Sequence, residues 1–160
     1  MNINTHLYDL PVLDAGDYIL RAIETSDAPD IYDYARREIV TRYMLWEAHK
    51  SVEDALKFIR FTAELNIDKK NMDWCIVEKS TNRVIGAIGA IVRSPKGEVM
   101  ELGYVLHPDF WGQGIMPRAA RAVRDFIFQN TTCIRLESRH FAENTASGRV
   151  MQKIGMTYEG

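Results

Sequence analysis

The chain has 160 residues, 46% of them hydrophobic and 26% charged, which is the composition of one globular domain that buries a core without disulfides or metal ions. The formal net charge of −2 gives no indication of nucleic-acid binding, and no apolar run approaches the roughly 18 residues of a membrane span. Cys75 and Cys133 have neither CxxC spacing nor paired histidines, which favours two buried thiols in a reducing cytoplasm over a disulfide or a metal site.

The first half of the chain predicts one strand followed by two helices. Residues 18–23 form a β-prone run, and the apolar positions of residues 28–39 recur at the spacing of a helix with one buried stripe. Residues 41–49 are mixed and aromatic, and we expect a loop there. Ser51 begins the next helix, where Asp54 three residues later makes a weak capping box.

The central section has the spacing that is typical of strands. Residues 74–77, 83–92 and 98–106 are apolar runs separated by two turn-like segments, 80–82 and 94–97. Strands joined by turns this short are expected to be antiparallel neighbours in one sheet.

The last section predicts a strand-helix-strand unit. A helix with apolar positions over residues 119–130 connects the strand 98–106 to a strand at 133–139, so these two strands are expected to be parallel. Asn144 caps a final helix that ends at Gly155. The sequence therefore predicts an α/β (α+β) domain with a mixed, mostly antiparallel central sheet and helices on both faces.

A glycine-containing loop, WGQGIMP at residues 111–117, lies between a strand and a helix. Gly112 and Gly114 allow a tight turn and a close approach to a ligand, and Pro117 is predicted at the first helical position. Free backbone N–H groups and the positive end of the helix dipole favour a diphosphate there. The spacing matches neither a Walker loop nor a full GxGxxG fingerprint, and a plain strand-to-helix turn is the alternative.

Two blocks of sequence carry a resemblance to a known family. The first is ELGYVLHPDFWGQG at residues 101–114, and the second combines ENTAS at 143–147 with VMQKIGM at 150–156. Together they resemble the GNAT superfamily of N-acetyltransferases, specifically the group that acetylates the N-terminal amines of ribosomal proteins, such as ribosomal-protein-alanine N-acetyltransferases. The resemblance implies a single acetyl-CoA-dependent N-acetyltransferase domain over residues 1–160, in which acetyl-CoA lies between two splayed parallel strands and no metal takes part.

The resemblance also implies which residues bind acetyl-CoA. Main-chain groups of the strand that ends at residue 106 would contact the pantetheine arm, and loop amides would contact the pyrophosphate. The implied set is Tyr104, Val105, Leu106, Trp111, Gly112, Gln113, Gly114, Ile115 and Met116. Trp111 and Met116 stand at the two ends of the family's Q/R-x-x-G-x-G/A pattern, which removes a polar side chain but leaves the backbone donors.

Two residues of the second block are implied to contact the ligand as well. In the resembled group Asn144 binds the pantetheine arm, and Ser147 lies near the sulfur as a proton donor. The alternative is structural, because Asn144 is also a good helix cap and Ser147 would then be a first-turn residue. Both roles are compatible with each other.

Acetyl transfer requires a neutral amine, so a base is expected near the thioester. Glu101 and Glu137 lie on the two strands that would flank it, and a carboxylate in a partly apolar cleft can have a pKa high enough to accept a proton. The resemblance favours Glu137 slightly. For each of them, an ion pair on the sheet surface is the alternative.

Other residues are weaker candidates for the site. His107 and His140 are further possible bases, although His107 precedes a proline and fits a loop role better. His49 lies near the front loop and is a candidate contact for the substrate, and the aromatic segment 43–46 is expected either to line the acceptor pocket or to fill the core. The acceptor itself stays open, because a protein N-terminus, a polyamine and an amino sugar would each fit.

The resembled family continues beyond the position of Gly160 through a last strand, so that strand is expected to be missing here. A truncated chain and a natural short form both remain open, and an exposed strand edge would favour a homodimer. Three hypotheses follow: an acetyltransferase that acts on a primary amine, preferably a protein N-terminal amine, by direct attack in a ternary complex; a non-catalytic CoA-binding module; and an interaction domain whose glycine loop is only a turn.

Overall fold

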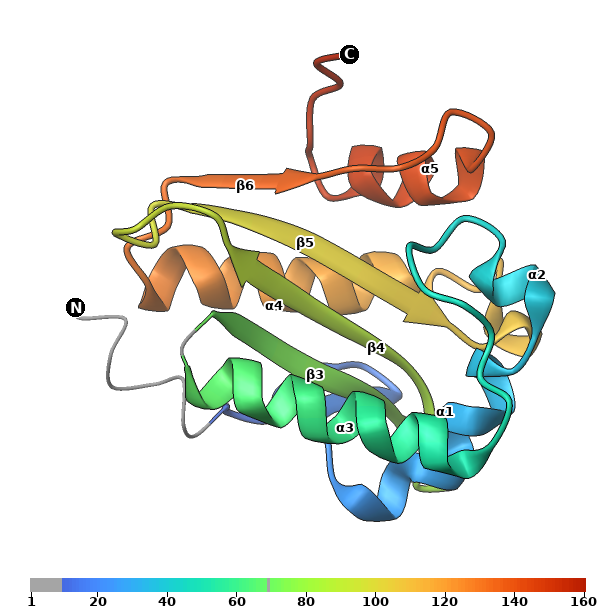
Figure 1. Cartoon of the computed structure of the whole chain (residues 1–160). Coiled ribbons are helices and arrows are strands. Elements are labelled where there is room, and N and C mark those ends of the chain that lie inside the picture. Colours follow the sequence, from blue (N-terminus) through green and yellow to red (C-terminus); the bar gives the residue numbers. More distant parts are fainter. Residues whose placement is uncertain (1–9, 69) are drawn as a thin grey trace.

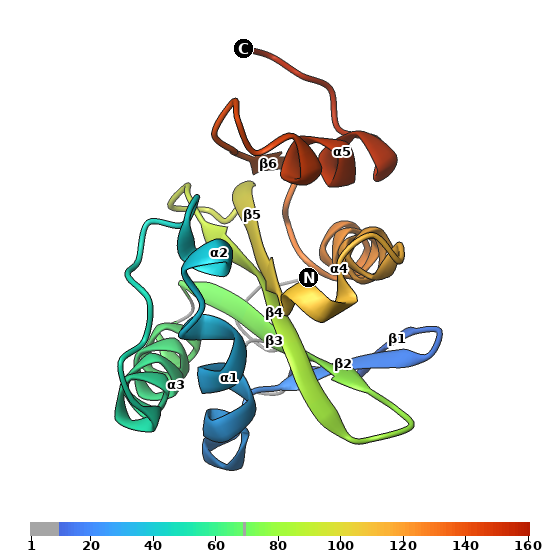
Figure 2. The same ribbon diagram turned by 90° about the vertical axis from the view of Figure 1, so that its right-hand side faces the viewer.

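The computed structural model describes residues 10–68 and 70–160, which form one six-stranded sheet with helices on both faces (Figures 1 and 2). The strands, which are neighbours in chain order, are β1 (Leu13–Ala15), β2 (Tyr18–Ala22), β3 (Asn71–Glu78), β4 (Arg83–Val92), β5 (Val99–Leu106) and β6 (Arg135–Ser138). The α-helices are α1 (Ala28–Ala35), α2 (Glu38–Thr41), α3 (Val52–Ile67), α4 (Ile115–Asn130) and α5 (Thr145–Lys153). Short 3₁₀ turns, Thr25–Asp27 and Pro108–Phe110, precede α1 and follow β5.

The predicted mixed sheet is confirmed. β1 to β5 pair antiparallel, and β5 and β6 pair parallel across the helix α4. The strand predicted at residues 83–92 has the same bounds in the structure, whereas β3 is longer and β6 shorter than predicted. β1 was not predicted, because a three-residue strand is too short to show an alternating pattern.

The single helix expected over residues 28–39 is wrong, because the chain breaks into α1 and α2. Arg37 leaves the helical conformation, with φ −90° and ψ 120°. Its side-chain Nε donates to the Asp33 carbonyl at 2.9 Å, which is the acceptor that the Arg37 N–H would use in a continuous helix. The Arg37 N–H bonds instead to the carbonyl of Tyr34 at 3.2 Å. The break lets the chain turn toward the loop that precedes α3.

Two hydrophobic cores lie on opposite faces of the sheet (Figure 2). The core under α4 includes the buried helix residues Ile115, Met116, Ala119, Ala120, Val123 and Ile127. The core under α1 and α3 includes Ile31, Tyr34, Ala55, Ile59 and Cys75. Burial of each large aliphatic side chain contributes about 1.5–3 kcal/mol, so α4 is held firmly against the strands that border the predicted ligand site.

The two helices predicted near the ligand begin close to where the sequence places them. α4 begins at Ile115, so Pro117 occupies its third position and the prediction of the first position is wrong; Gly114, with φ 73°, is the N-cap. The third position also has no intrahelical N–H partner, so proline is tolerated there. Asn144 caps α5, and Gly155 ends it with φ 88°, as predicted.

Both cysteine thiols are free and buried, as the sequence predicted. No helix in the described part of the chain is long and apolar enough to cross a membrane.

Candidate active site

The sheet opens between β5 and β6 after the pair formed by Leu102 and Ser138. The Ser138 hydroxyl donates a hydrogen bond of 2.9 Å to the Leu102 carbonyl, which therefore faces β6. Alternate residues of a strand direct their backbone polar groups to the same edge, so those of Tyr104 and Leu106 face the opening and those of Val105 face β4. Beyond the last pair, β5 thus presents main-chain donors and acceptors to the gap.

The glycine loop leads directly into the start of α4, where Gly114 is the N-cap. Gly112 and Gly114 have φ angles of 74° and 73°, which side chains rarely adopt, and a Cβ at either position would meet no atom within 4 Å. No described residue accepts a hydrogen bond from the N–H groups of residues 112–116. These donors, with the positive end of the α4 dipole behind them, fit a pyrophosphate.

Side chains of the loop hold it against the end of β5. The Trp111 indole N–H donates to the Leu106 carbonyl at 2.8 Å, so this carbonyl is already occupied while the Leu106 N–H still faces the gap. The Gln113 side chain donates to the Asp109 carbonyl at 3.1 Å. Trp111 therefore replaces the polar residue of the family pattern with a side chain that ties the loop to the strand.

His107 is fully buried behind this loop. Its Nδ1 accepts a hydrogen bond of 3.1 Å from the Asp109 backbone N–H, so Nε2 carries the proton and donates to Asp33 Oδ2 at 3.0 Å. Both ring nitrogens are engaged away from solvent. The geometry therefore makes His107 a residue that positions the loop, in line with the loop role that its sequence context favoured.

Asp33 in α1 forms ion pairs with three arginines in addition to its hydrogen bond with His107. Arg83 contacts its carboxylate at 2.8 Å, and Arg36 and Arg37 contact it at 3.2 Å each. Burial alone would raise the pKa of Asp33, but hydrogen bonds from His107, Arg37 and Arg36 together hold the pKa well below its usual value. The carboxylate therefore stays charged and keeps the His107 tautomer fixed.

The two carboxylates that the sequence singled out lie side by side, because Glu101 and Glu137 are direct partners in the parallel ladder. Glu101 Oε2 accepts from Arg93 at 2.7 Å and from Arg139 at 2.8 Å. Burial raises the pKa of Glu101, but these two arginines outweigh it and hold the pKa below its ordinary value. Glu137 accepts from Arg135 at 3.0 Å and is more exposed. Both therefore form the ion pairs that were the alternative to a base.

Tyr104 and Ser147 meet at the same gap from elements 43 residues apart in the chain. The Tyr104 hydroxyl donates to the Ser147 carbonyl at 2.9 Å and lies 3.0 Å from the Ser147 hydroxyl. Burial raises the pKa of Tyr104, and the hydrogen bond with Ser147 partly offsets the shift. Asn144 Oδ1 accepts from the Ser147 N–H at 3.3 Å, which is the predicted helix cap. The sequence indicated only the backbone of Tyr104, so this pair of hydroxyls was missed.

The loop between α2 and α3 borders the gap through aromatic side chains. The rings of Tyr43 and Phe141 lie 6.3 Å apart, which joins this loop to the segment between β6 and α5. The rings of Trp46 and His49 lie 5.4 Å apart at a tilt of 47°, and burial lowers the pKa of His49, which favours the neutral ring. His140 donates through Nδ1 to the Phe141 carbonyl at 2.8 Å. Leu45 and Trp46 are exposed, so the aromatic segment does not fill the core, and its role in an acceptor pocket stays a prediction.

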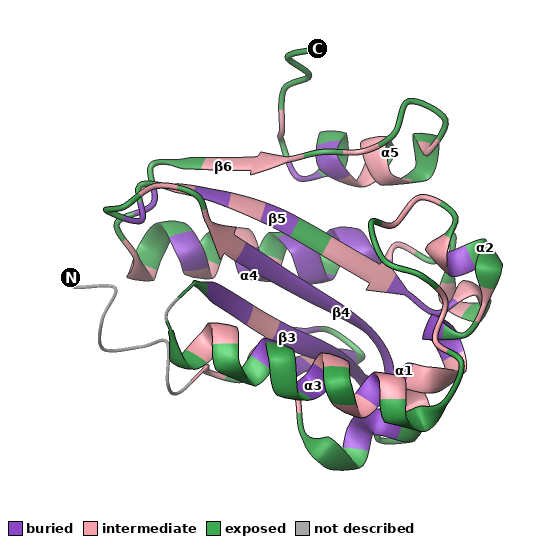
Figure 3. Cartoon of the chain, in the orientation of Figure 1, coloured by how far each residue is buried: buried purple, intermediate pink, exposed green. Residues whose placement is uncertain are grey.

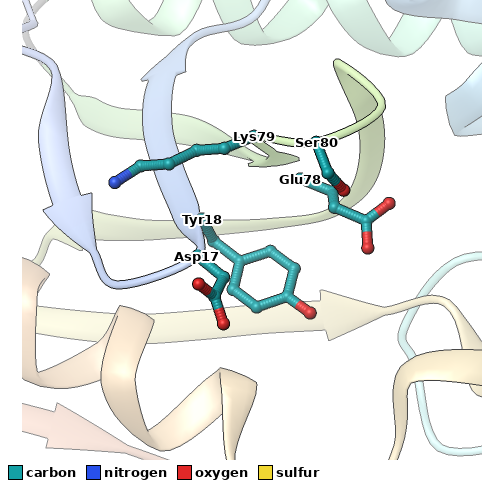
Figure 4. Close-up of a pocket in the computed structure, with 5 residues that line it drawn as sticks. All are labelled: Asp17, Tyr18, Glu78, Lys79 and Ser80. Atoms are coloured by element: carbon teal, nitrogen blue, oxygen red, sulfur yellow. The ribbon is translucent and has the colours of Figure 1, made fainter.

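A hollow of about 440 Å³ lies at the turn between β3 and β4, away from every residue assigned to the site (Figure 4). It is lined by Asp17, Tyr18, Glu78, Lys79 and Ser80. The Lys79 ammonium is already paired with Asp14 at 2.7 Å.

Across residues 10–68 and 70–160, no cluster of three His, Cys, Asp or Glu side chains is arranged to hold a metal ion.

The fold and the gap together define a class of protein. A sheet that opens between two parallel strands, beside a helix N-terminus with free N–H groups, suits an enzyme that binds a long ligand with a pyrophosphate at one end. The model of the "Acetyltransferase (GNAT) domain" family matches residues 17–157, which is most of the chain. The protein belongs to this family and is an acetyltransferase, as the sequence resemblance implied.

Individual relatives agree with this assignment. The chain is 31% identical to the uncharacterized N-acetyltransferase YoaA of Bacillus subtilis, over 94% of this chain and 85% of that protein. It is similar to the crystal structure of a GNAT-family acetyltransferase from Bacillus anthracis, with a TM-score of 0.83, 26% identity and coverage of 94% and 86%. It is also similar to the structure of ribosomal-protein-S5-alanine acetyltransferase from Vibrio fischeri, with a TM-score of 0.75, 26% identity and coverage of 94% and 85%.

Proposed function

We propose that this protein transfers the acetyl group of acetyl-CoA to a primary amine, with the N-terminal amine of a protein as the favoured acceptor, by direct attack in a ternary complex. Two observations carry the proposal: β5 is unpaired with β6 beyond Leu102, and the same strand runs into a loop whose N–H groups at residues 112–116 have no acceptor among the described residues. The acceptor class is supported by the likeness to a ribosomal-protein-alanine acetyltransferase at 26% identity. Residues 1–160 would form the single domain that carries this activity.

The chain's own main-chain groups would hold acetyl-CoA, which supplies the activated thioester. The amides of residues 112–116 would bind the pyrophosphate, and the backbone of Tyr104 with the Leu106 N–H would bind the pantetheine arm. The Asn144 side chain uses its oxygen for the α5 cap, which leaves its amide NH₂ available to the arm. Val105 and Trp111 would shape the site by packing.

Acyl transfer also needs groups that move protons. Ser147 and Tyr104 share a hydrogen bond at the gap, so this pair would protonate the departing sulfur. The main-chain N–H of Tyr104, which also faces the gap, would polarise the acetyl carbonyl. Of the two carboxylates on the ladder, Glu137 is the better candidate base, because Glu101 is held by two arginines.

The ion pairs of Glu101 and Glu137 also favour a second candidate function, a CoA-binding module without turnover. Two measurements on the purified chain separate these functions. Acetyl-CoA should raise the melting temperature, and free CoA should appear with a panel of alanyl and seryl peptides, spermidine and an amino sugar. A thermal shift without CoA release would select the binding module. Absence of both responses would contradict the two functions together.

A further inference from the structure

Asp73 in β3 is a carboxylate that neither the family resemblance nor the pattern of the chain singled out. It lies two residues before Cys75, on the sheet face covered by α1 and α3. Its Oδ2 is buried and has no hydrogen-bond partner among the described residues. A Cβ placed on Gly89, its direct partner in β4, would collide with Oδ1, so the Asp73 side chain leans over that glycine toward β5.

Asp73 is connected to the gap by cross-strand pairing from β3 through β4 to β5. Asp73 pairs with Gly89, and Gly89 pairs with Gly103, which is the first residue of β5 beyond the last β5–β6 pair. Neighbouring strands lie about 4.8 Å apart, so a carboxylate above Gly89 lies about one strand spacing from Gly103. Gly103 is exposed although it lies in the middle of a strand, and a Cβ there would meet nothing within 4 Å. Figure 3 shows this exposed segment of β5.

The environment of Asp73 differs from that of the two glutamates. Within the described residues it forms no ion pair, whereas arginines hold both Glu101 and Glu137. Burial raises the pKa of Asp73 to about 6, and only the side chain of Asn71 acts in the opposite direction. The facing elements add no free charge, because the α3 residues buried toward the sheet are Ala55, Ile59 and Thr62, and Glu101 carries its own arginines.

We propose that Asp73 binds the ammonium group of the acceptor and accepts its proton before acyl transfer. The inference rests on the proposed acetyltransferase function and assigns its base. A buried carboxylate oxygen without a partner, about one strand spacing from the exposed Gly103, is the group that a primary ammonium would complete, whereas arginines hold both Glu101 and Glu137. The proton-donating pair of Tyr104 and Ser147 lies on the opposite, α4-facing side of β5. The two proton transfers are thereby separated by the strand.

The protons and electrons balance with these groups. Asp73 takes one proton from the ammonium, and the nitrogen lone pair then forms the C–N bond to the acetyl carbon while the C–S bond breaks. The electron pair of that bond leaves with the sulfur, and the Ser147–Tyr104 pair delivers a proton to it. The second proton of the nitrogen leaves to solvent, and solvent reprotonates the pair. The proton on Asp73 returns to solvent, so one proton is released overall.

The test compares Asp73→Asn with Glu137→Gln and with the matched control Asp68→Asn, an exposed carboxylate paired with Lys70 at the end of α3. The amine of the panel with the highest kcat/KM serves as acceptor. We expect Asp73→Asn to lower kcat/KM at pH 7 by about 10²–10⁴-fold, with the loss shrinking as the pH approaches the pKa of the amine itself. The affinity for CoA, measured by calorimetry, should stay within about twofold of wild type, and Asp68→Asn should match wild type.

A second readout does not depend on turnover. In ¹³C-carboxyl NMR of the chain without acetyl-CoA, Asp73 should titrate near pH 6, and addition of spermidine should shift its resonance. A titration near pH 4 would overturn the proposal, as would Asp73→Asn with at least half of wild-type kcat/KM, or a variant that loses CoA affinity or folding. A loss confined to Glu137→Gln would make Glu137 the base. If wild type binds CoA but acetylates no amine, the proposed function fails, and the NMR result still decides whether Asp73 binds an ammonium.

Discussion

His107 Nε2 lies 3.0 Å from Asp33 Oδ2, and this hydrogen bond joins the end of β5 to α1 across 74 positions of the chain. The same imidazole accepts from the Asp109 backbone, so one buried ring sets the start of the glycine loop. The loop that would bind the pyrophosphate is therefore anchored through His107 to α1, a helix that is distant from it in sequence.

Replacement of His107 by alanine should weaken both the fold and CoA binding. The variant leaves the Asp109 N–H without its acceptor and removes one of the hydrogen bonds to Asp33 Oδ2, which keeps Arg83, and this costs about 1–3 kcal/mol of the free energy of unfolding. Urea denaturation would measure that loss, and calorimetry would measure the weaker binding of CoA. His140→Ala, a change at a ring that bonds only to its neighbouring carbonyl, is the control. Unchanged stability of His107→Ala would contradict the positioning role.

Asp73→Asn should stabilise the protein at neutral pH. The pKa of Asp73 is about 6 in the folded chain against an ordinary value of 3.8, so folding favours the neutral carboxyl. Its favourable contribution is fully present below pH 3.8 and is lost as the pH rises through 6, at a cost of about 3 kcal/mol. Urea denaturation at pH 4.5 and pH 7.5 should show this loss in wild type and not in Asp73→Asn. A variant that unfolds more easily at pH 7.5 would contradict it.

Tyr104→Phe and Ser147→Ala should lower kcat by roughly 10–100-fold while the affinity for CoA changes little, because each removes a hydroxyl and keeps the backbone contacts. Steady-state kinetics with acetyl-CoA and the panel amine would measure the change. Asn144→Ala is the contrasting variant, since loss of the helix cap should cost about 1 kcal/mol of stability. Full activity of both hydroxyl variants would show that the sulfur leaves without their proton.

Gly114→Ala should weaken CoA binding through the backbone. Gly114 has φ 73°, and an alanine in that conformation costs about 1–2 kcal/mol although its Cβ would meet no atom. The loop amides should then leave their cradle geometry, and calorimetry with CoA should show a weaker complex. Gly103→Ala is the matched control for stability, because Gly103 is extended and its Cβ would also be unobstructed. Equal melting temperatures of the two variants would contradict the role of the left-handed turn.

Much of the fold could be predicted because its signals are local. The bounds of β4, the parallel pairing of β5 and β6 across a helix, and the Asn144 cap each follow from patterns a few residues long. The three-residue strand β1 and the break at Arg37 were not predictable in this way. Both depend on single contacts, such as the bond from Arg37 Nε to the Asp33 carbonyl, that leave no periodic trace.

The candidate site was predictable only in part. The glycine loop and the ENTAS block are each a short continuous motif, so the sequence alone showed both. The structure brings the two motifs to the two sides of one gap. The roles of Glu101 and Glu137 could not be predicted, because the sequence of a strand does not show whether an arginine faces its glutamate. Arg139 lies 38 positions from Glu101, and only the register of β5 against β6 brings the two together.

By itself, the sequence determined the mixed α/β sheet, the position of the glycine loop and the membership of the GNAT acetyltransferase family, since these depend on periodicity, glycine positions and short motifs. The tertiary structure decided which side chains are free to act. It placed Glu101 between two arginines, joined Tyr104 to Ser147, and left Asp73 over Gly89 without an ion pair among the described residues. The physical reason is that the charge state and reactivity of a side chain depend on burial and on partners from distant strands, which only the paired sheet brings together.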